Sequence, residues 1–193
     1  FRHPNLALGF KDGVLKNLIN NSIFSDQKRS TIGVASCDID QDGMEETYFL
    51  NTDTYSGEKK YSDRLLNFNK EITDLFELPK NQKNLNLTAG RSVVCVDRKG
   101  DGKYGFYVAN YGGPTRFYEL NNDLIRDIAP DLKIDKITGG RAVVAGHILS
   151  DKMDIFAANE RGPNFLYLNE KDKFYNVSTE YNTDDVLDTL KLK

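Results

Sequence analysis

Residues 37–46 read Cys37-Asp38-Ile39-Asp40-Gln41-Asp42-Gly43-Met44-Glu45-Glu46. Three aspartates alternate, a glycine supplies a sharp bend, and a glutamate stands at the ninth position of the loop. Carboxylates at this spacing offer the oxygen ligands that a hard cation such as Ca²⁺ requires, and without a cation they would repel one another. The loop therefore predicts a calcium site formed by Asp38, Asp40, Asp42, the backbone carbonyl of Met44, and Glu46.

The flanks of this loop distinguish it from an EF-hand. An EF-hand loop ends in a bidentate glutamate at position twelve, where this sequence has Phe49. The neighbouring residues 31–36 and 47–50 are rich in β-branched and aromatic side chains, which favour strands over helices. We therefore expect a calcium loop at the tip of a β-hairpin. An ordinary Asp-Gly turn is the alternative, because that dipeptide is itself a strong hairpin signal.

The segment around the loop is repeated along the chain. Residues 33–51 recur as residues 92–110, a constant shift of 59 positions, and again as residues 142–159. A second pattern and a further apolar strand follow each copy, so each unit is expected to contain four short antiparallel strands. One of these last strands is predicted over residues 72–76. Four-stranded antiparallel units repeated every ~50–60 residues are typical of β-propeller blades.

We therefore predict an all-β, partial β-propeller with about three and a half four-stranded blades. The segments are, in order, the outer half of a preceding blade (1–19), a blade with the calcium loop (31–78), a second blade (91–129), a third blade (141–179) and a tail (180–193). A partial ring leaves sheet edges open, and open edges favour self-association or pairing with sequence outside this chain. Because the first residue is Phe rather than Met, we expect a processed or excised chain.

Charge and hydropathy argue against two kinds of partner. The net charge of −3 combines 26 Lys and Arg with 29 Asp and Glu, and no basic stripe stands out, so we expect no nucleic acid. No apolar run has the length of a transmembrane helix, so we expect no membrane insertion.

The two cysteines, Cys37 and Cys95, occupy matching places in successive repeats. They form either a disulfide, if the compartment is oxidising, or two buried thiols.

Several motifs together resemble the cartilage acidic protein family. They lie at residues 32–43, 48–52, 90–100, 138–141 and 162–166, and the most specific of them reads Gly90-Arg91-Ser92-Val93-Val94-Cys95-Val96-Asp97-Arg98-Lys99-Gly100. The family consists of secreted proteins built from FG-GAP/VCBS repeats, the repeat class of the integrin α-subunit propeller. The resemblance covers nearly the whole chain and weakens in the tail. It implies an extracellular, calcium-binding, usually glycosylated propeller that works through protein contacts and has no catalytic centre.

The first repeat keeps all the matching ligands, and the other two do not. In the second repeat Asp97 and Asp101 match, but Lys99 and Gly105 replace the third and ninth positions. We therefore expect a degenerate loop in which the lysine ammonium stands in for the ion. In the third repeat, residues 147–154 have lost the pattern, and we expect no ion there.

Three sequons permit N-glycosylation in a secreted protein. They are Asn20-Asn21-Ser22, Asn86-Leu87-Thr88 and Asn176-Val177-Ser178. Asn20 and Asn86, in apparent linkers between blades, are better candidates than Asn176, which lies in a predicted strand.

The sequence thus predicts an extracellular module in which calcium has a structural role and which binds matrix or cell-surface proteins. We expect no enzymatic activity, because the two histidines, His3 and His147, belong to no Ser-His-Asp or Cys-His arrangement. A propeller-type glycosidase or lectin is one alternative, disfavoured because the chain has no Trp and its clustered acids are assigned to the metal. A truncated isoform without independent activity is the other.

Overall fold

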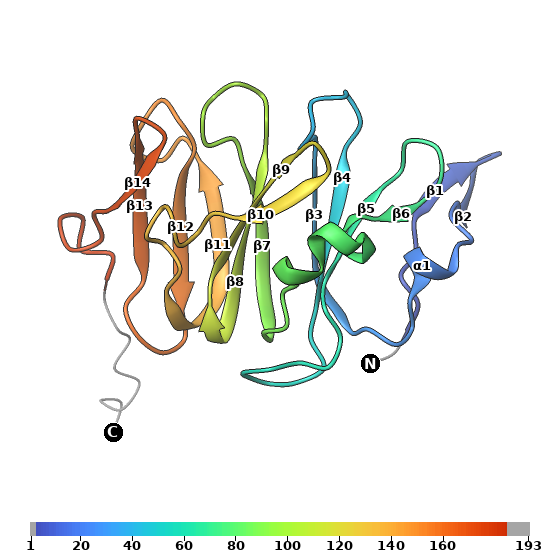
Figure 1. The fold of residues 1–193 in the computed structure, drawn as a ribbon, viewed down its shortest axis with the longest axis horizontal. Helices are drawn as coiled ribbons and strands as arrows, with labels where there is room; N and C mark the ends of the chain where they lie inside the picture. Colours follow the sequence, from blue (N-terminus) through green and yellow to red (C-terminus); the bar gives the residue numbers. More distant parts are fainter. Residues whose placement is uncertain (1–2, 185–193) are drawn as a thin grey trace.

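The computed structural model describes residues 3–184 as an all-β structure with short helical turns (Figure 1). The strands are β1 (Leu8–Lys11), β2 (Val14–Asn17), β3 (Thr31–Cys37), β4 (Glu46–Asn51), β5 (Arg64–Asn67), β6 (Thr73–Asp74), β7 (Gly90–Val96), β8 (Gly105–Pro114), β9 (Arg116–Asn121), β10 (Leu124–Asp127), β11 (Ile137–Gly146), β12 (Asp154–Asn159), β13 (Phe165–Glu170) and β14 (Lys173–Asn176). The helical turns are α1 (Ser22–Ser25), η1 (Leu75–Glu77) and η2 (Pro79–Asn84).

The strands pair antiparallel with their neighbours in sequence. β3 to β6 form a four-stranded sheet in chain order. β7 to β10 pair in the same way, as do β11 to β14, and a β8–β11 contact joins these two groups into one sheet of eight strands. β1 and β2 form a separate hairpin. In Figure 1 the groups stand side by side from the blue hairpin to the orange strands, as a curled half-barrel.

The predicted segments map onto these groups as follows. Segment 1–19 contains the β1–β2 hairpin, and segments 31–78, 91–129 and 141–179 contain β3 to β6, most of β7 to β10, and most of β11 to β14. The all-β class is confirmed. In the predicted tail 180–193, residues 185–193 lie outside the described residues.

Buried side chains fill the spaces between neighbouring groups of strands. One cluster, which includes Tyr48, Phe76 and Phe106, lies between the β3–β6 and β7–β10 groups. A second, which includes Tyr107 and Tyr167, lies between the β7–β10 and β11–β14 groups. The second strands β4 and β8 are buried along most of their length, since they pack on both faces, whereas β12 is buried at three of its six residues. This arrangement explains why aromatic residues are so frequent in strands.

The first strand of each group carries a β-bulge where its pairing with the second strand begins. The bulges leave Ile32 of β3, Arg91 of β7 and Arg141 of β11 without a partner in the register. An extra residue in one strand bends it and re-aims a side chain. The three bulged side chains therefore occupy equivalent places at one end of the half-barrel.

The predicted strand over residues 72–76 is wrong beyond Asp74. The chain turns there into the 3₁₀ helix η1, because the Asp74 carboxylate accepts the amide hydrogen of Phe76 at 3.0 Å and caps the turn. The same carboxylate accepts the Leu65 amide at 3.2 Å. A side chain that offers the backbone an alternative partner favours a cap over a continued strand.

Candidate metal centre

The acidic loop connects β3 to β4 at one end of the first sheet. Cys37 and Glu46 face each other in the register, so the intervening residues form the hairpin tip that the sequence predicts. Gln41 and Gly43 have positive φ values of 66° and 86°. The backbone therefore folds back twice within the loop, which is how alternate side chains come to point inward.

Three aspartates converge in this loop. One carboxylate oxygen from each of Asp38, Asp40 and Asp42 lies within 4.8 Å of the other two. The Asp38 carboxylate accepts amide hydrogens from Gln41 at 2.6 Å and Gly43 at 3.0 Å, which holds the loop closed. Three acidic oxygens this close together fit a divalent cation with oxygen ligands.

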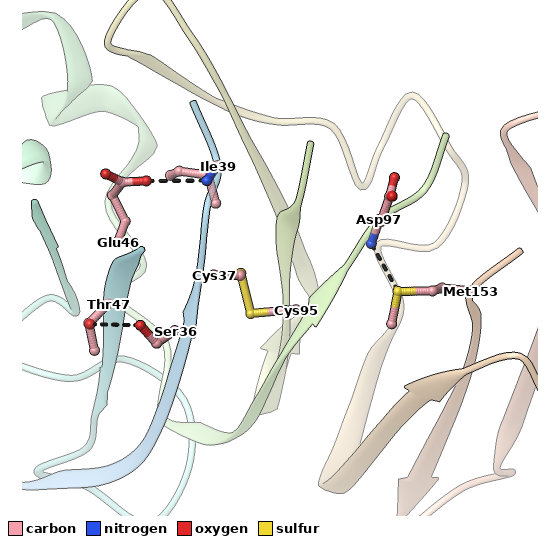
Figure 2. The surroundings of a disulfide bond; sticks show 8 residues. All are labelled: Ser36, Cys37, Ile39, Glu46, Thr47, Cys95, Asp97 and Met153. Atoms are coloured by element: carbon pink, nitrogen blue, oxygen red, sulfur yellow. Dashed lines mark hydrogen bonds between the residues drawn. A yellow bond between two sulfur atoms is a disulfide. The ribbon is translucent and has the colours of Figure 1, made fainter. Parts of the chain in front are cut away.

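The other two predicted ligands, Glu46 and Met44, do not belong to this cluster of carboxylates. Glu46 is completely buried; its carboxylate accepts the amide hydrogen of Ile39 at 3.2 Å (Figure 2) and the side-chain amide of Asn67 at 2.8 Å. Burial raises the pKa of Glu46 to about 7, and the nearby aspartates add to the effect. Met44 is 46% exposed, and its backbone amide donates to the Asp42 carboxylate at 2.8 Å.

Two further side chains, which the sequence does not single out, make hydrogen bonds at the loop. Asn69 donates a hydrogen bond to the Asp42 carboxylate, and Gln41 donates to the carbonyl of Asp101 at 2.9 Å. The second contact links the first acidic loop to the corresponding loop of the next repeat. Residue spacing within the loop does not predict either contact, because each contact joins parts of the chain that are distant in sequence.

The second acidic loop has lost its ligand cluster. Asp97 accepts three backbone amide hydrogens, the shortest from Gly100 at 2.7 Å, and so closes a turn. In residues 3–184, Asp97 and Asp101 belong to no set of three clustered metal-binding side chains. The predicted substitution of Lys99 for an ion is not seen, since no ion pair joins it to either aspartate within the described chain. Instead Lys152 donates to the Lys99 carbonyl at 3.0 Å.

In the third repeat Asp154 occupies the place that Glu46 has in the first, as the first residue of the second strand. It is completely buried and accepts hydrogen bonds from the amides of Leu149, Ser150 and Asn169 and from the Ser150 hydroxyl, at 2.6 to 3.0 Å. These donors lower the pKa of Asp154 although burial opposes them. The carboxylate thus closes this loop through hydrogen bonds of its own.

A disulfide joins Cys37 at the end of β3 to Cys95 in β7 (Figure 2). The Cα atoms are 6.3 Å apart, and 58 positions separate the two residues in sequence. The bond links the first strands of adjacent groups, directly beside the acidic loop and within the first core cluster. It therefore ties the base of the loop to the neighbouring sheet.

A buried ion pair lies at the opposite end of the first sheet. Lys59 and Asp63 pair with fully buried side chains. The Asp63 carboxylate also accepts hydrogen bonds from the Tyr48 hydroxyl at 2.7 Å, the Asn51 amide at 2.7 Å and the Asn86 side chain at 2.6 Å. Burial raises the pKa of Asp63 and lowers that of Lys59, against the attraction between them. No local sequence pattern indicates this network, because its members come from distant parts of the chain.

The network corrects one glycosylation candidate. Asn86 is completely buried, and its side-chain nitrogen donates to Asp63 and, at 3.0 Å, to Asn110. A glycan on this nitrogen has no room in the folded chain, so Asn86 is not a glycosylation site of this structure. Asn20 and Asn176 are exposed, and both remain predicted sites.

Fold and loop together define an all-β repeat protein, a curled half-barrel of antiparallel sheets with three clustered aspartates in the loop between β3 and β4. The chain is 40% identical to "Cartilage acidic protein 1" of Xenopus tropicalis and of Homo sapiens, in both cases over 96% of its length. The Mus musculus protein of that name is 41% identical over 86% of the chain. These similarities support the cartilage acidic protein family name. No family model matches the chain.

The chain spans about a third of the length of these relatives, 33%, 32% and 30% respectively. Within the described residues, no helix combines the length and the apolar character that a membrane crossing requires.

Proposed function

We propose that this chain is a calcium-binding part of an extracellular FG-GAP/VCBS-type β-propeller that mediates contacts with matrix or cell-surface proteins. The observation that carries the proposal is the convergence of the Asp38, Asp40 and Asp42 carboxylates within 4.8 Å. The similarity to proteins named cartilage acidic protein 1 supports it.

Three groups of four sequential antiparallel strands support the propeller interpretation. The equivalent bulges of β3, β7 and β11 are what a repeated blade would produce. The β1–β2 hairpin would then be the outer half of a further blade. Its apolar side chains are exposed, up to 79% for Phe10, which leaves a face for strands from elsewhere in a longer chain or for self-association.

Asp38, Asp40 and Asp42 would hold the ion, with the Met44 carbonyl completing the loop and Glu46 at its base. The ion would neutralise carboxylates that otherwise repel one another. The role we assign to it is structural: it fixes the loop before a partner binds, which lowers the ordering cost of recognition. We assign no catalytic activity to the chain.

An extracellular location agrees with two features of the chain. The disulfide between Cys37 and Cys95 suits an oxidising compartment. Exposed sequons at Asn20 and Asn176 suit the secretory pathway.

Isothermal titration calorimetry with calcium chloride tests the metal site. We expect one binding site, with a dissociation constant of about 10⁻⁴ to 10⁻³ M, as in other extracellular modules. Asp40→Ala should abolish the binding heat, because it removes the central carboxylate of the cluster. The matched control, Asp101→Ala, changes an aspartate of the second loop and should leave calcium binding unchanged. No binding heat for the unmodified chain, or equal losses in both variants, would contradict the proposal.

A further inference from the structure

A cationic pocket lies at the end of the half-barrel where the first strands have their bulges. Its cavity of about 870 Å³ is lined by all three bulged residues, Ile32, Arg91 and Arg141, and by Tyr55 and Tyr61 of the β4–β5 connection. This volume is in the range of ordinary ligand sites. The repeated bulge thus delivers one side chain from each group of strands to a single site.

Two arginines and two tyrosines form a compact stack beside this cavity. The Arg91 guanidinium lies 5.2 Å from the ring centre of Tyr55 and 5.3 Å from that of Tyr111. The Arg141 guanidinium lies 5.6 Å and 5.4 Å from the same two rings. Cation–π contacts of this kind hold long side chains in one orientation. The two positive charges are therefore presented by a fixed aromatic platform.

The lining carries more positive than negative charge. Its cations are Lys28, Lys60, Arg91 and Arg141, and its one carboxylate is Asp53. Asp53 is already engaged by the backbone amides of Lys60 and Tyr61 at 3.1 Å. Arg141 pairs with Glu160, whereas no ion pair of the other three cations occurs within residues 3–184. On a chain of net charge −3, this pocket concentrates unpaired cations.

Arg91 has a buried nitrogen atom, Nε, without a hydrogen-bond partner. It donates to two backbone carbonyls, those of Gly90 and Tyr55. Burial lowers the pKa of Arg91, and the charge of Arg141 acts in the same direction. Two guanidinium groups held near each other without enough carboxylates are stabilised when an anion binds between them.

We propose that this pocket binds carboxylate side chains of an acidic peptide segment in a protein partner. A guanidinium can match a carboxylate with two parallel hydrogen bonds. Arg141 already pairs with one carboxylate here, that of Glu160. Arginine and tyrosine are also among the residues that contribute most to binding in protein interfaces. The inference rests on the proposed recognition function and gives that function a site.

Fluorescence anisotropy with a labelled oligoglutamate peptide tests the pocket. We expect saturable binding that weakens about tenfold or more in Arg91→Gln and in the Arg91→Gln/Arg141→Gln double variant. Lys60→Gln, a change of an exposed lysine at the same cavity, should weaken binding less. The matched control is Arg126→Gln on β10, because Arg126 is exposed and lies outside the pocket. It should bind like the unmodified chain.

Three results would overturn the inference. They are the absence of saturable peptide binding, an equal loss in Arg126→Gln, and preferential binding of a sulfated heparin fragment that competes with the peptide, which would make the ligand a glycan. Circular dichroism confirms that each variant is folded, and Lys60→Gln keeps the test valid if the arginine variants do not fold. Calcium calorimetry on the same variants separates the two proposals: intact calcium binding without peptide binding rejects the pocket alone.

Discussion

Replacing Asp63 by asparagine is expected to lower the free energy of unfolding by about 3–5 kcal/mol. The change removes the negative charge and leaves the Lys59 ammonium buried without its partner. In the unmodified chain the Tyr48 hydroxyl and the Asn86 side chain both donate hydrogen bonds to the Asp63 carboxylate. The amide group of an asparagine would add a donor of its own to a site that is already surrounded by donors. Urea denaturation followed by circular dichroism measures the loss.

The matched control is Glu77→Gln. Glu77 also makes an ion pair, with Arg64, but its side chain is 59% exposed. An exposed pair contributes less than about 1 kcal/mol, so this variant should unfold almost like the unmodified chain. The double variant Lys59→Met/Asp63→Asn should recover part of the loss, since no unpaired charge is left. An equal effect of Asp63→Asn and Glu77→Gln would show that the buried pair has no special importance.

Removing the disulfide is expected to cost a similar amount. The bond closes a loop between residues 58 positions apart. The chain-entropy account assigns about 4 kcal/mol to a loop of this length, because the bond restricts the unfolded chain. Urea denaturation of the Cys37→Ser/Cys95→Ser double variant, compared with the unmodified chain, measures the difference.

Reductant supplies the control for this prediction. The unmodified chain should lose stability when a strong reductant is added, and the double variant should not respond, because it has no bond to reduce. If the unmodified chain unfolds at the same urea concentration with and without reductant, the bond contributes nothing and the prediction fails.

Local patterns predict much of this fold. The strands on either side of the acidic loop follow from β-branched and aromatic residues, and the repeat at a shift of 59 positions places corresponding strands in the next group. The convergence of Asp38, Asp40 and Asp42 could be anticipated because alternation and a glycine bend bring neighbouring side chains together. These features depend on local residue patterns and on the repetition of those patterns along the chain.

Features that depend on distant contacts could not be predicted in this way. The Asn69 contact with Asp42 crosses 27 positions and the Asn86 contact with Asp63 crosses 23. The second of these turns an apparent sequon into a buried structural residue. In the sequence, Arg91 and Arg141 look like ordinary strand residues. Their position in the pocket could not be predicted, because a bulge is a property of the pairing of two strands rather than of one strand.

A thermal melt in calcium and in excess chelator tests the central claim most directly. A ligand present at about 100 times its dissociation constant stabilises a protein by about 2.7 kcal/mol, which corresponds to roughly 5–10 °C for a chain of this size. We expect calcium to raise the melting temperature of the unmodified chain by about this amount. The melting temperature of Asp40→Ala should be low and the same with and without calcium. If calcium shifts neither melt, the acidic loop is an ordinary turn and the structural role that we assign to calcium is wrong.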